Sequence, residues 1–432
     1  MMPPKERKRC RSLPLDVLSN LPDNVIDIIL MCLPCKDAVR TSILSMKWRY
    51  HWCRLTELTL DESLWETQKD LQNPTVKFTK IIYQLLSLHE GPITKFTLKI
   101  DFLKESCPTI DNFICFLSRN DIQDLVLHLP WRKLYKLPSS LFTCSQLRHL
   151  NLHYFSIHHP STFQGFDKLI SLELCGVTIS SELLESLISH CPLLEQLVLD
   201  TAGNSNKIEI YGPMLRSFDF KGDISSICLK NVPRLVKVYL AGYYMRAEDL
   251  DFAKVFESCF ALEHLLLNFF NSEIFAEEGY EAPTRLPFDL SVKRFYLPHI
   301  YLVDAYKLSY ALCLIRSFRY LEYLEIQVDS EAEDDDGILE SLELERFLDV
   351  TFNHLREVKL DCFGGTTPEM QLIKLLLAKS PMLVRMLIDR RCLDHEPLDT
   401  RLKIFAEVSN FSRASPKAEV VYDISKYQIT YI

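Results

Sequence analysis

Four residues near the N-terminus have the types and spacing of a possible metal site. Cys32 and Cys35 form a Cys-x-x-Cys pair, and His51 and Cys53 follow. Structural Zn²⁺ is usually held by four such thiolate and imidazole ligands. However, Cys32 falls on or beside the apolar face of a predicted helix, and His-x-Cys is an unusual ligand spacing. We therefore expect no metal, and buried, inert thiols instead.

Other motifs of catalytic or cofactor chemistry are missing from the sequence. There is no GxxxxGK[ST] phosphate loop, no GxGxxG dinucleotide loop and no GxSxG nucleophile turn, and only 11 glycines could build such loops. Ser, His and Asp residues occur throughout, but no spacing singles out three of them as a catalytic triad. We expect a protein that is not an enzyme and has no cofactor.

The cysteine pair belongs to a segment, LSNLPDNVIDIILMCLP at 18–34, that has the pattern of an amphipathic helix. Pro22 suits the first turn, and Asp23 places negative charge at the positive end of the helix dipole. Pro34 is expected to end the helix. The apolar residues of one face are Val25, Ile26, Ile29, Leu30 and Leu33.

Two further short helices are predicted directly after this one. One covers 36–44, and the next is capped by Ser45 and contains Trp48 and Trp52 one turn apart. Three short helices cannot bury this much apolar area among themselves. Something else must therefore cover part of it.

Residues 18–55 resemble the plant form of the F-box. The matching positions are Leu21, Pro22, Ile29, Leu30, Leu33, Pro34, the run 36–42, Leu44, Ser45, Trp48, Arg49 and Trp52. Met46 and Cys32 are mild departures from the family pattern. The alternative is an ordinary internal three-helix core.

This resemblance implies a docking surface for a Skp-type adaptor, which links F-box proteins to the cullin and RING proteins of a ubiquitin ligase. It implies an adaptor-binding role for Leu21, Pro22, Ile29, Leu33, Pro34, Val39, Leu44 and Trp48.

The body of the chain repeats the pattern L-x-x-L-x-L at leucine-rich-repeat spacing. Starts at 122, 147, 169, 194, 215, 235 and 262 are separated by 20 to 27 residues, with looser copies at 55, 93, 292, 321, 355 and 383. Helical segments are predicted at 180–192, 247–259 and 368–381, and an acidic loop, DSEAEDDDG, interrupts the widest gap. The predicted fold class is α/β, with a curved strand-helix solenoid following the F-box.

The C-terminal region resembles the FBD domain of plant F-box proteins. The segment LREVKLDCFGGTTPEMQLIKLLLAKSPMLVRMLI and the ending FSRASPKAEV at 411–420 carry this resemblance. We expect this unit to continue or cap the solenoid, because a terminal unit must cover the open core of the last repeat. The predicted domains are a basic tail at 1–15, the F-box at 16–56, leucine-rich repeats at 57–343 and the FBD unit at 344–425.

The polar positions of the predicted strands suggest where a target would bind. Positions 4 and 6 of each pattern point into the core, so positions 3, 5 and 7 lie on the concave face. Their mixture of aromatic and charged residues suits protein recognition, although loops could carry the target instead. The target-binding candidates are His149, Asn151, Gln196, Lys237, Tyr239, His264, Arg294, Tyr296 and Tyr323.

Composition limits the classes of binding partner and the cellular compartment that we expect. A net charge of −9 argues against a general nucleic-acid binder, and no apolar run is long enough for a bilayer span. The basic N-terminus lacks the apolar stretch of a secretory signal, and 14 scattered cysteines suit reduced thiols in the nucleus or cytoplasm.

Taken with the resemblance, these features imply the substrate-recognition subunit of a Skp-cullin-F-box ubiquitin ligase. Two alternatives remain open. One is a non-catalytic scaffold or sequestering protein, and the other is a small-molecule-dependent receptor similar to the auxin-receptor type, against which the absence of a concentrated basic pocket argues.

Overall fold

The computed structural model describes residues 18, 20–61, 74–100, 108–132, 134–158, 163–201, 207–242, 244–269, 273–275, 277, 281, 283–300, 302, 305–328 and 351–423. The predicted basic tail, the acidic loop and the first seven residues of the predicted FBD unit, 344–350, lie outside these ranges. The chain divides into two compact units, Met1–Leu147 and Arg148–Ile432.

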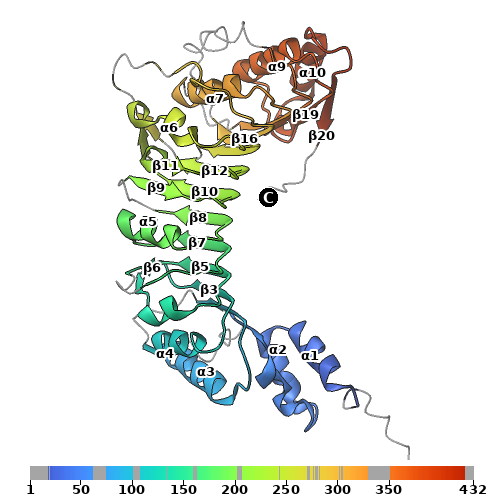
Figure 1. Ribbon diagram of the computed structural model, residues 1–432. Helices are drawn as coiled ribbons and strands as arrows, with labels where there is room; N and C mark the ends of the chain where they lie inside the picture. Colours follow the sequence, from blue (N-terminus) through green and yellow to red (C-terminus); the bar gives the residue numbers. More distant parts are fainter. Residues whose placement is uncertain are drawn as a thin grey trace, which may run out of the picture. The chain divides into compact units, whose positions relative to one another are not determined.

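The first unit begins with the short helices α1 (Asp23–Met31), α2 (Cys35–Arg40), η1 (Thr41–Ile43) and η2 (Trp48–Arg54), drawn in blue in Figure 1. Their apolar centre contains Ile26, Leu30 and Trp48, each at most 2% exposed. The helix predicted after Pro22 is confirmed.

Pro34 ends the first helix as predicted, since α1 ends at Met31 and the last helical backbone hydrogen bond reaches Leu33. The predicted cap of the third helix is wrong. Ser45 does not cap the third helix, which is a 3₁₀ helix starting after Lys47 without a side-chain cap. The tighter 3₁₀ turn aligns residues three apart, and this brings Trp48 and His51 to the same buried side.

Three parallel strands follow in the first unit: β1 (Glu57–Leu60), β2 (Lys95–Lys99) and β3 (Asp124–His128). Helices α3 (Pro74–Leu88) and α4 (Pro108–Leu117) connect them, and the short β4 (Tyr135–Lys136) and η4 (Ser139–Thr143) follow. Each strand begins two residues after a predicted pattern start, so the repeat extends back to residue 55.

The second unit is built on a long parallel sheet whose strands pair in chain order. The strands are β5 (His149–His153), β7 (Ser171–Cys175), β8 (Gln196–Asp200), β10 (Ser217–Gly222), β12 (Lys237–Gly242), β14 (His264–Asn268), β16 (Arg294–Ile300), β17 (Tyr323–Val328), β18 (Glu357–Asp361), β19 (Arg385–Asp389) and β20 (Glu419–Asp423). From β5 to β19, each starts two residues after a predicted pattern start. The repeat prediction is confirmed.

Helices return the chain along one side of this sheet, and the strands form the other side (Figure 1). The helices are α5 (Ser181–Ser189), η5 (Ile224–Ser226), η6 (Ala247–Asp249), α6 (Phe252–Phe256), α7 (Ala305–Ser317), α9 (Thr367–Lys379), η7 (Cys392–His395) and α10 (Leu398–Asn410). The short strands β6 (Phe155–Ser156), β9 (Ile208–Tyr211), β11 (Ile227–Lys230), β13 (Tyr244–Arg246) and β15 (Glu273–Phe275) complete the unit.

The predicted helices at 180–192 and 368–381 are confirmed as α5 and α9, whereas the predicted helix at 247–259 is split into η6 and α6. Asp251 causes the split, because its side chain accepts hydrogen bonds from the backbone N–H groups of Ala253 and Lys254. Such an N-cap starts a new helix instead of continuing the old one.

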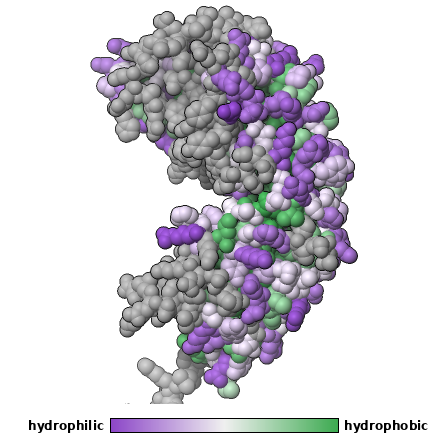
Figure 2. All heavy atoms as spheres, turned by 90° about the vertical axis from the view of Figure 1, so that its left-hand side faces the viewer, coloured by the Kyte–Doolittle hydropathy of each residue, from purple (hydrophilic) through white to green (hydrophobic). Residues whose placement is uncertain are grey.

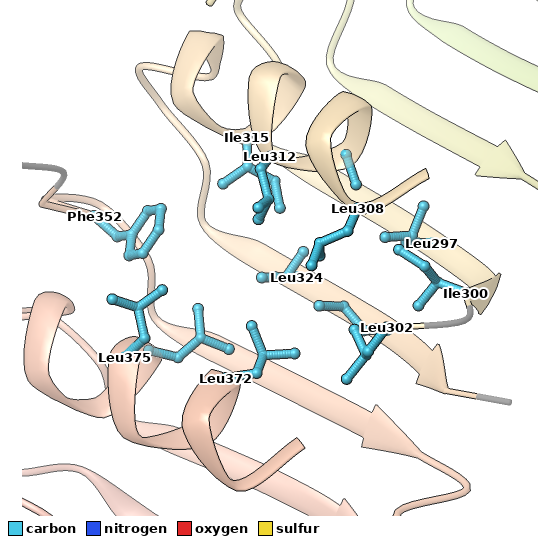
Figure 3. A pocket seen from close by; sticks show the side chains of 13 residues that line it. Leu297, Ile300, Leu302, Leu308, Leu312, Ile315, Leu324, Phe352, Leu372 and Leu375 are labelled. Carbon is cyan, nitrogen blue, oxygen red and sulfur yellow. The ribbon is translucent and has the colours of Figure 1, made fainter. Parts of the chain in front are cut away.

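Neighbouring repeats share an apolar core. Figure 3 shows one part of it, where side chains of α7, α9, β16 and β17 face one another around a cavity of about 20 Å³. Its lining, including Leu308, Leu324 and Leu372, is entirely apolar. A water needs polar partners, so we interpret this space as a dry packing gap.

The ending that resembles an FBD domain leads directly into β20, which pairs in parallel with β19. Helix α10 lies next to it, with the rings of Phe405 and Tyr422 4.3 Å apart and Val408 fully buried. The Ser415 hydroxyl donates to the carbonyl of Leu383 at 2.6 Å. These contacts continue the sheet by one strand, while the boundaries predicted for the unit stay a prediction.

No helix in the described part of the chain is long and apolar enough to cross a membrane.

Candidate functional site

The N-terminal helices leave a set of large apolar side chains exposed. Ile43 and Met46 are 86% and 85% exposed, and four others on or after α1 and η1 are 36% to 55% exposed. We call these residues the N-terminal apolar set; they are Ile28, Met31, Leu33, Ile43, Leu44 and Met46. Several large apolar side chains left exposed in one short module are typical of a protein-interaction surface.

Polar contacts hold the helices that present this set. His51, 8% exposed, lies with Nδ1 3.1 Å from Oδ1 of Asp27, so η2 is tied to α1. The Lys47 ammonium lies 3.1 Å from Oδ1 of Asp23 and also donates to the carbonyl of Leu21. The hydrogen bond that Lys47 donates to the Asp23 carboxylate, together with the Lys47 charge, lowers the pKa of Asp23. The module is therefore fixed without using the exposed apolar set.

The sequence-predicted adaptor residues fall into three groups. Pro22, Leu33, Pro34 and Leu44 are exposed, and Leu21, Ile29 and Val39 are partly exposed. Trp48 is different, because it is 2% exposed and its Nε1 donates to the carbonyl of Leu18 at 3.2 Å. In this structure Trp48 belongs to the interior of the module, not to its surface.

Four exposed apolar residues were missed by sequence reasoning: Ile28, Met31, Ile43 and Met46. One signal was available for the pair on α1, since Ile28 and Met31 are three residues apart and share a helix side away from buried Ile26. Met46 departs from the family pattern and is among the most exposed apolar residues in the described ranges.

The possible zinc ligands have separate environments. Cys32 is exposed, which corrects the prediction of a buried thiol, because α1 ends before it. Burial, with a smaller effect of Asp61, raises the pKa of the Cys35 thiol to about 11. Cys53 is buried, and His51 contacts Asp27. Within the described ranges, no three His, Cys, Asp or Glu side chains gather as a metal site.

A second candidate surface is the side of the second unit's sheet that faces away from the helices, which we call the open face. Strand alternation is as predicted: Leu197 and Leu265 are at most 1% exposed, while their neighbours Gln196 and His264 are not buried. Every predicted target-binding residue is likewise exposed or partly exposed: His149, Asn151, Gln196, Lys237, Tyr239, His264, Arg294, Tyr296 and Tyr323.

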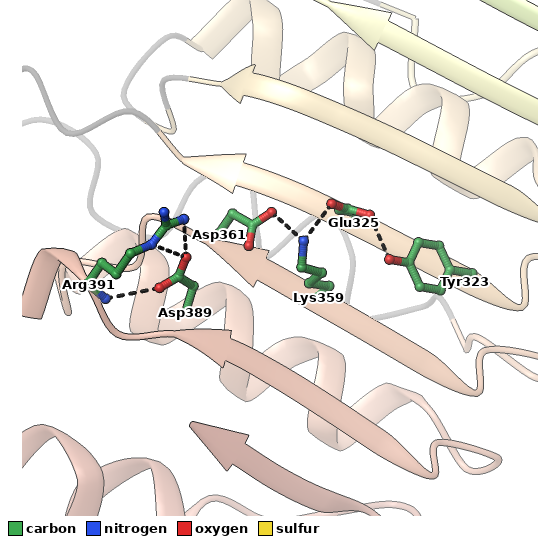
Figure 4. Close-up of polar contacts among 6 residues, drawn as sticks. All are labelled: Tyr323, Glu325, Lys359, Asp361, Asp389 and Arg391. Carbon is green, nitrogen blue, oxygen red and sulfur yellow. Dashed lines mark hydrogen bonds and ion pairs between the residues drawn. The ribbon is translucent and has the colours of Figure 1, made fainter. Parts of the chain in front are cut away.

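Charges on the C-terminal strands of the open face are paired with one another (Figure 4). The Lys359 ammonium donates to Glu325 at 2.9 Å and to Asp361 at 2.8 Å, and the Tyr323 hydroxyl donates to Glu325 at 2.6 Å. Burial would lower the pKa of Lys359, but these carboxylates raise it. This end of the face is a closed polar network.

The middle strands of the open face carry aromatic rings and cations. The rings of Tyr296 and Tyr323 are 5.5 Å apart, and the guanidinium carbon of Arg294 lies 5.2 Å from the centre of the Tyr323 ring. Burial lowers the pKa of His264, and the charges of Lys237 and Arg294 lower it further. Aromatic and arginine side chains are enriched among the residues that dominate protein interfaces.

The helical side of the molecule offers a different surface. In Figure 2 the coloured residues of this side are mostly hydrophilic, with hydrophobic ones gathered near the middle. A hollow of about 680 Å³ lies near β9, β11 and α6, with both carboxylates and cations in its wall, such as Glu209, Asp251 and Lys254. Mixed charge in an open hollow gives no selective attraction for an anionic small molecule.

Comparison with known proteins identifies both parts of the chain. The model of the F-box domain matches residues 18–59, and the model of the LRR repeats of "FBD-associated F-box protein At5g56370" matches residues 110–255. The Arabidopsis thaliana "F-box/FBD/LRR-repeat protein At1g13570" is 31% identical over 423 residues, which covers 94% of this chain and 98% of that protein.

Two other Arabidopsis thaliana relatives are matched over about half their length. "F-box/FBD/LRR-repeat protein At5g56420" is 28% identical over 53% of this chain and 56% of its own length, and "F-box/LRR-repeat protein At4g14103" is 32% identical over 43% and 49%. An F-box at one end, leucine-rich repeats through the body and near full-length similarity lead to one conclusion: the chain belongs to the family of plant F-box/FBD/LRR-repeat proteins.

Proposed function

We propose that this protein is the non-catalytic substrate-recognition subunit of a Skp-cullin-F-box ubiquitin ligase. The observation that carries the proposal is the N-terminal apolar set, exposed within the segment that matches the F-box domain. A Skp-type adaptor covers this set and links the chain to the cullin and RING proteins. The ligase partners supply the chemistry of ubiquitin transfer.

The energetic argument rests on apolar burial. Covering a large apolar side chain contributes about 1.5–3 kcal/mol, so a few of them suffice for a stable complex. Ile43 and Met46 are almost fully exposed and have the most area to lose. Contact with the adaptor at these two side chains therefore contributes most to the binding free energy.

In this proposal the open face of the sheet receives the target protein. Its middle strands present Tyr239, Tyr296, Tyr323 and Arg294, which are side chains of the kind that anchor interfaces. The two surfaces lie in different compact units, so one protein can hold the adaptor and the target by separate contacts. We place this activity in the nucleus or cytoplasm.

The test is adaptor-dependent ubiquitination of a captured partner, using the full chain and an Ile43→Asp, Met46→Asp variant. The charges should abolish adaptor capture and ubiquitin transfer, and leave partner capture unchanged. The control is Phe260→Asp, which alters a side chain 79% exposed in the second unit. Partner capture without any adaptor-dependent ubiquitination by the unaltered chain would favour a scaffold or sequestering protein.

A further inference from the structure

The middle of the open face has a row of cationic and imidazole side chains. Lys237 on β12, His264 on β14 and Arg294 on β16 are register partners on consecutive strands, and Tyr323 on β17 continues the row. Neighbouring parallel strands lie about 4.8 Å apart, so Lys237 and Arg294 are separated by roughly 10 Å along the row.

Neither cation of this row forms an ion pair within the described ranges. Lys359 is held by Glu325 and Asp361 on the same face, but neither Lys237 nor Arg294 forms an ion pair with any residue in the described ranges. Arg294 instead contacts the Tyr323 ring, and its pKa is raised by Tyr296 and, more weakly, by the charge of Glu357. The positive charges of this row are therefore open to an external partner.

The electrostatic surroundings of His264 agree with this reading. After burial, the charges of Lys237, Arg294 and Lys293 lower its pKa, and Glu263 alone opposes them. Lys293 and Glu263 form their own ion pair at 2.7 Å, so they largely cancel. The field at the imidazole therefore comes mainly from the two cations of the row.

One carboxyl on the neighbouring strand lies close to the row. Asp219 on β10 is the register partner of Tyr239, and Lys221 and Lys237 act on it. Burial and the charge of Glu173 raise the pKa of Asp219, whereas Lys221 and Lys237 lower it. Asp219 forms no ion pair with Lys237 within the described ranges, and its charge acts on Lys221 as well as on Lys237.

From this row we infer that the target segment bound by the open face is an extended acidic peptide, whose carboxylates lie against Lys237 and Arg294 and whose backbone packs on Tyr239, Tyr296 and Tyr323. This inference rests on the proposed role of the open face in target binding and adds the chemistry of the target. A single compact anion would reach one end of the row, whereas carboxylates distributed along a peptide reach both ends.

The spacing specifies a sharp probe. Extended polyproline II structure advances about 3.1 Å per residue with three residues per turn, so positions i and i+3 lie on one side about 9 Å apart. This matches two strand spacings. A fluorescent peptide of repeated Glu-Pro-Pro triplets is therefore the probe, with Gln-Pro-Pro and Lys-Pro-Pro peptides of equal length as neutral and basic controls.

The experiment measures the anisotropy of each peptide against the full chain in complex with its adaptor. The acidic peptide should bind, and the neutral and basic peptides should bind at least about tenfold more weakly. Lys237→Gln with Arg294→Gln should reduce acidic-peptide affinity on the order of tenfold or more. Because both side chains lie outside the core, circular dichroism should be unchanged.

The matched control is Arg385→Gln, which alters an exposed cation at the same strand position on β19. Arg385 lies three strands beyond Arg294 and has Glu357 and Glu419, not cations, as its register neighbours, so peptide binding should not change. Raised salt should weaken acidic-peptide binding, because the row is solvent-accessible.

Three results would overturn the inference: equal binding of the acidic and neutral peptides, undiminished binding by the Lys237→Gln, Arg294→Gln variant, or preferential binding of a single-stranded oligonucleotide. Adaptor binding is measured in the same samples. An unaltered chain that binds the adaptor but not the acidic peptide refutes the acidic-peptide inference alone, whereas an unaltered chain that fails to bind the adaptor refutes the proposed ligase role.

Discussion

The most demanding prediction concerns Ile43 and Met46, the two most exposed members of the N-terminal apolar set. Ile43→Ala removes three carbon groups from a side chain that is 86% exposed, and Met46→Ala removes three heavy atoms from one that is 85% exposed. If an adaptor covers both side chains, each substitution removes about 2 kcal/mol of binding free energy, because each buried methylene group contributes about 0.8 kcal/mol. The sum is about 4 kcal/mol.

This energy corresponds to a roughly 10³-fold weaker dissociation constant, because about 1.4 kcal/mol is a factor of ten. The free energy of unfolding should scarcely change, since neither side chain is part of the core. Biolayer interferometry against a purified Skp-type adaptor measures the first quantity, and thermal unfolding measures the second.

Two controls separate surface from core. Phe260→Ala removes an equally exposed apolar side chain from the second unit and should leave adaptor affinity unchanged. Ile26→Ala opens a cavity at a fully buried position and should destabilise the helices by about 2–5 kcal/mol, so folding and binding fail together. A double variant whose adaptor affinity falls less than threefold would show that Ile43 and Met46 do not contact the adaptor.

Three further predictions concern folding of the second unit. Leu197→Asp should destabilise by several kcal/mol, because Leu197 is 1% exposed, whereas Gln196→Ala should have little effect; equal shifts in thermal unfolding would contradict the strand phase. Burial raises the pKa values of Glu173 and Asp219, so the folded state binds more protons than the unfolded state and loses stability as pH rises above about 4. In urea titrations, a Glu173→Gln, Asp219→Asn variant should therefore gain free energy of unfolding relative to the unaltered chain as pH rises through the range where these carboxyls ionise, and the gain should then level off. A difference that does not change with pH would contradict this prediction. Glu369→Ala should cost about 1–3 kcal/mol in chemical unfolding, because the carboxylate accepts from the N–H groups of residues 364 and 366 at the start of α9, and a smaller loss would mean that water replaces it.

The strands were predictable because their signal is local and repeated. Leucines at positions 4 and 6 of each pattern, such as Leu265 and Leu267, are both fully buried, and the period of two leaves His264 on the other side. Even weak copies of the pattern, such as the one before β17, gave the correct strand. Twenty-residue spacing then required a helical or irregular return to the next parallel strand.

The surface of the N-terminal module was less predictable from periodicity. A helical stripe shows that a face is apolar but not whether the chain itself or another molecule covers it. Ile29 and Leu30 are adjacent in sequence, yet Leu30 is fully buried and Ile29 is only partly so. Which side turns inward depends on how Trp48 packs, a contact across eighteen or more residues that no local pattern contains.

Pairing on the open face was likewise invisible in the sequence. Lys237 and Lys359 occupy equivalent strands and both read as exposed lysines, but the structure places two carboxylates against Lys359 and none against Lys237 within the described ranges. A cation already held by carboxylates must break those contacts before it binds a partner, and this offsets the gain. An unpaired cation loses only its hydration. The register of neighbouring strands, and not the number of charges, therefore determines which cations of the face are left without an ion pair, and the proposed target site follows from that.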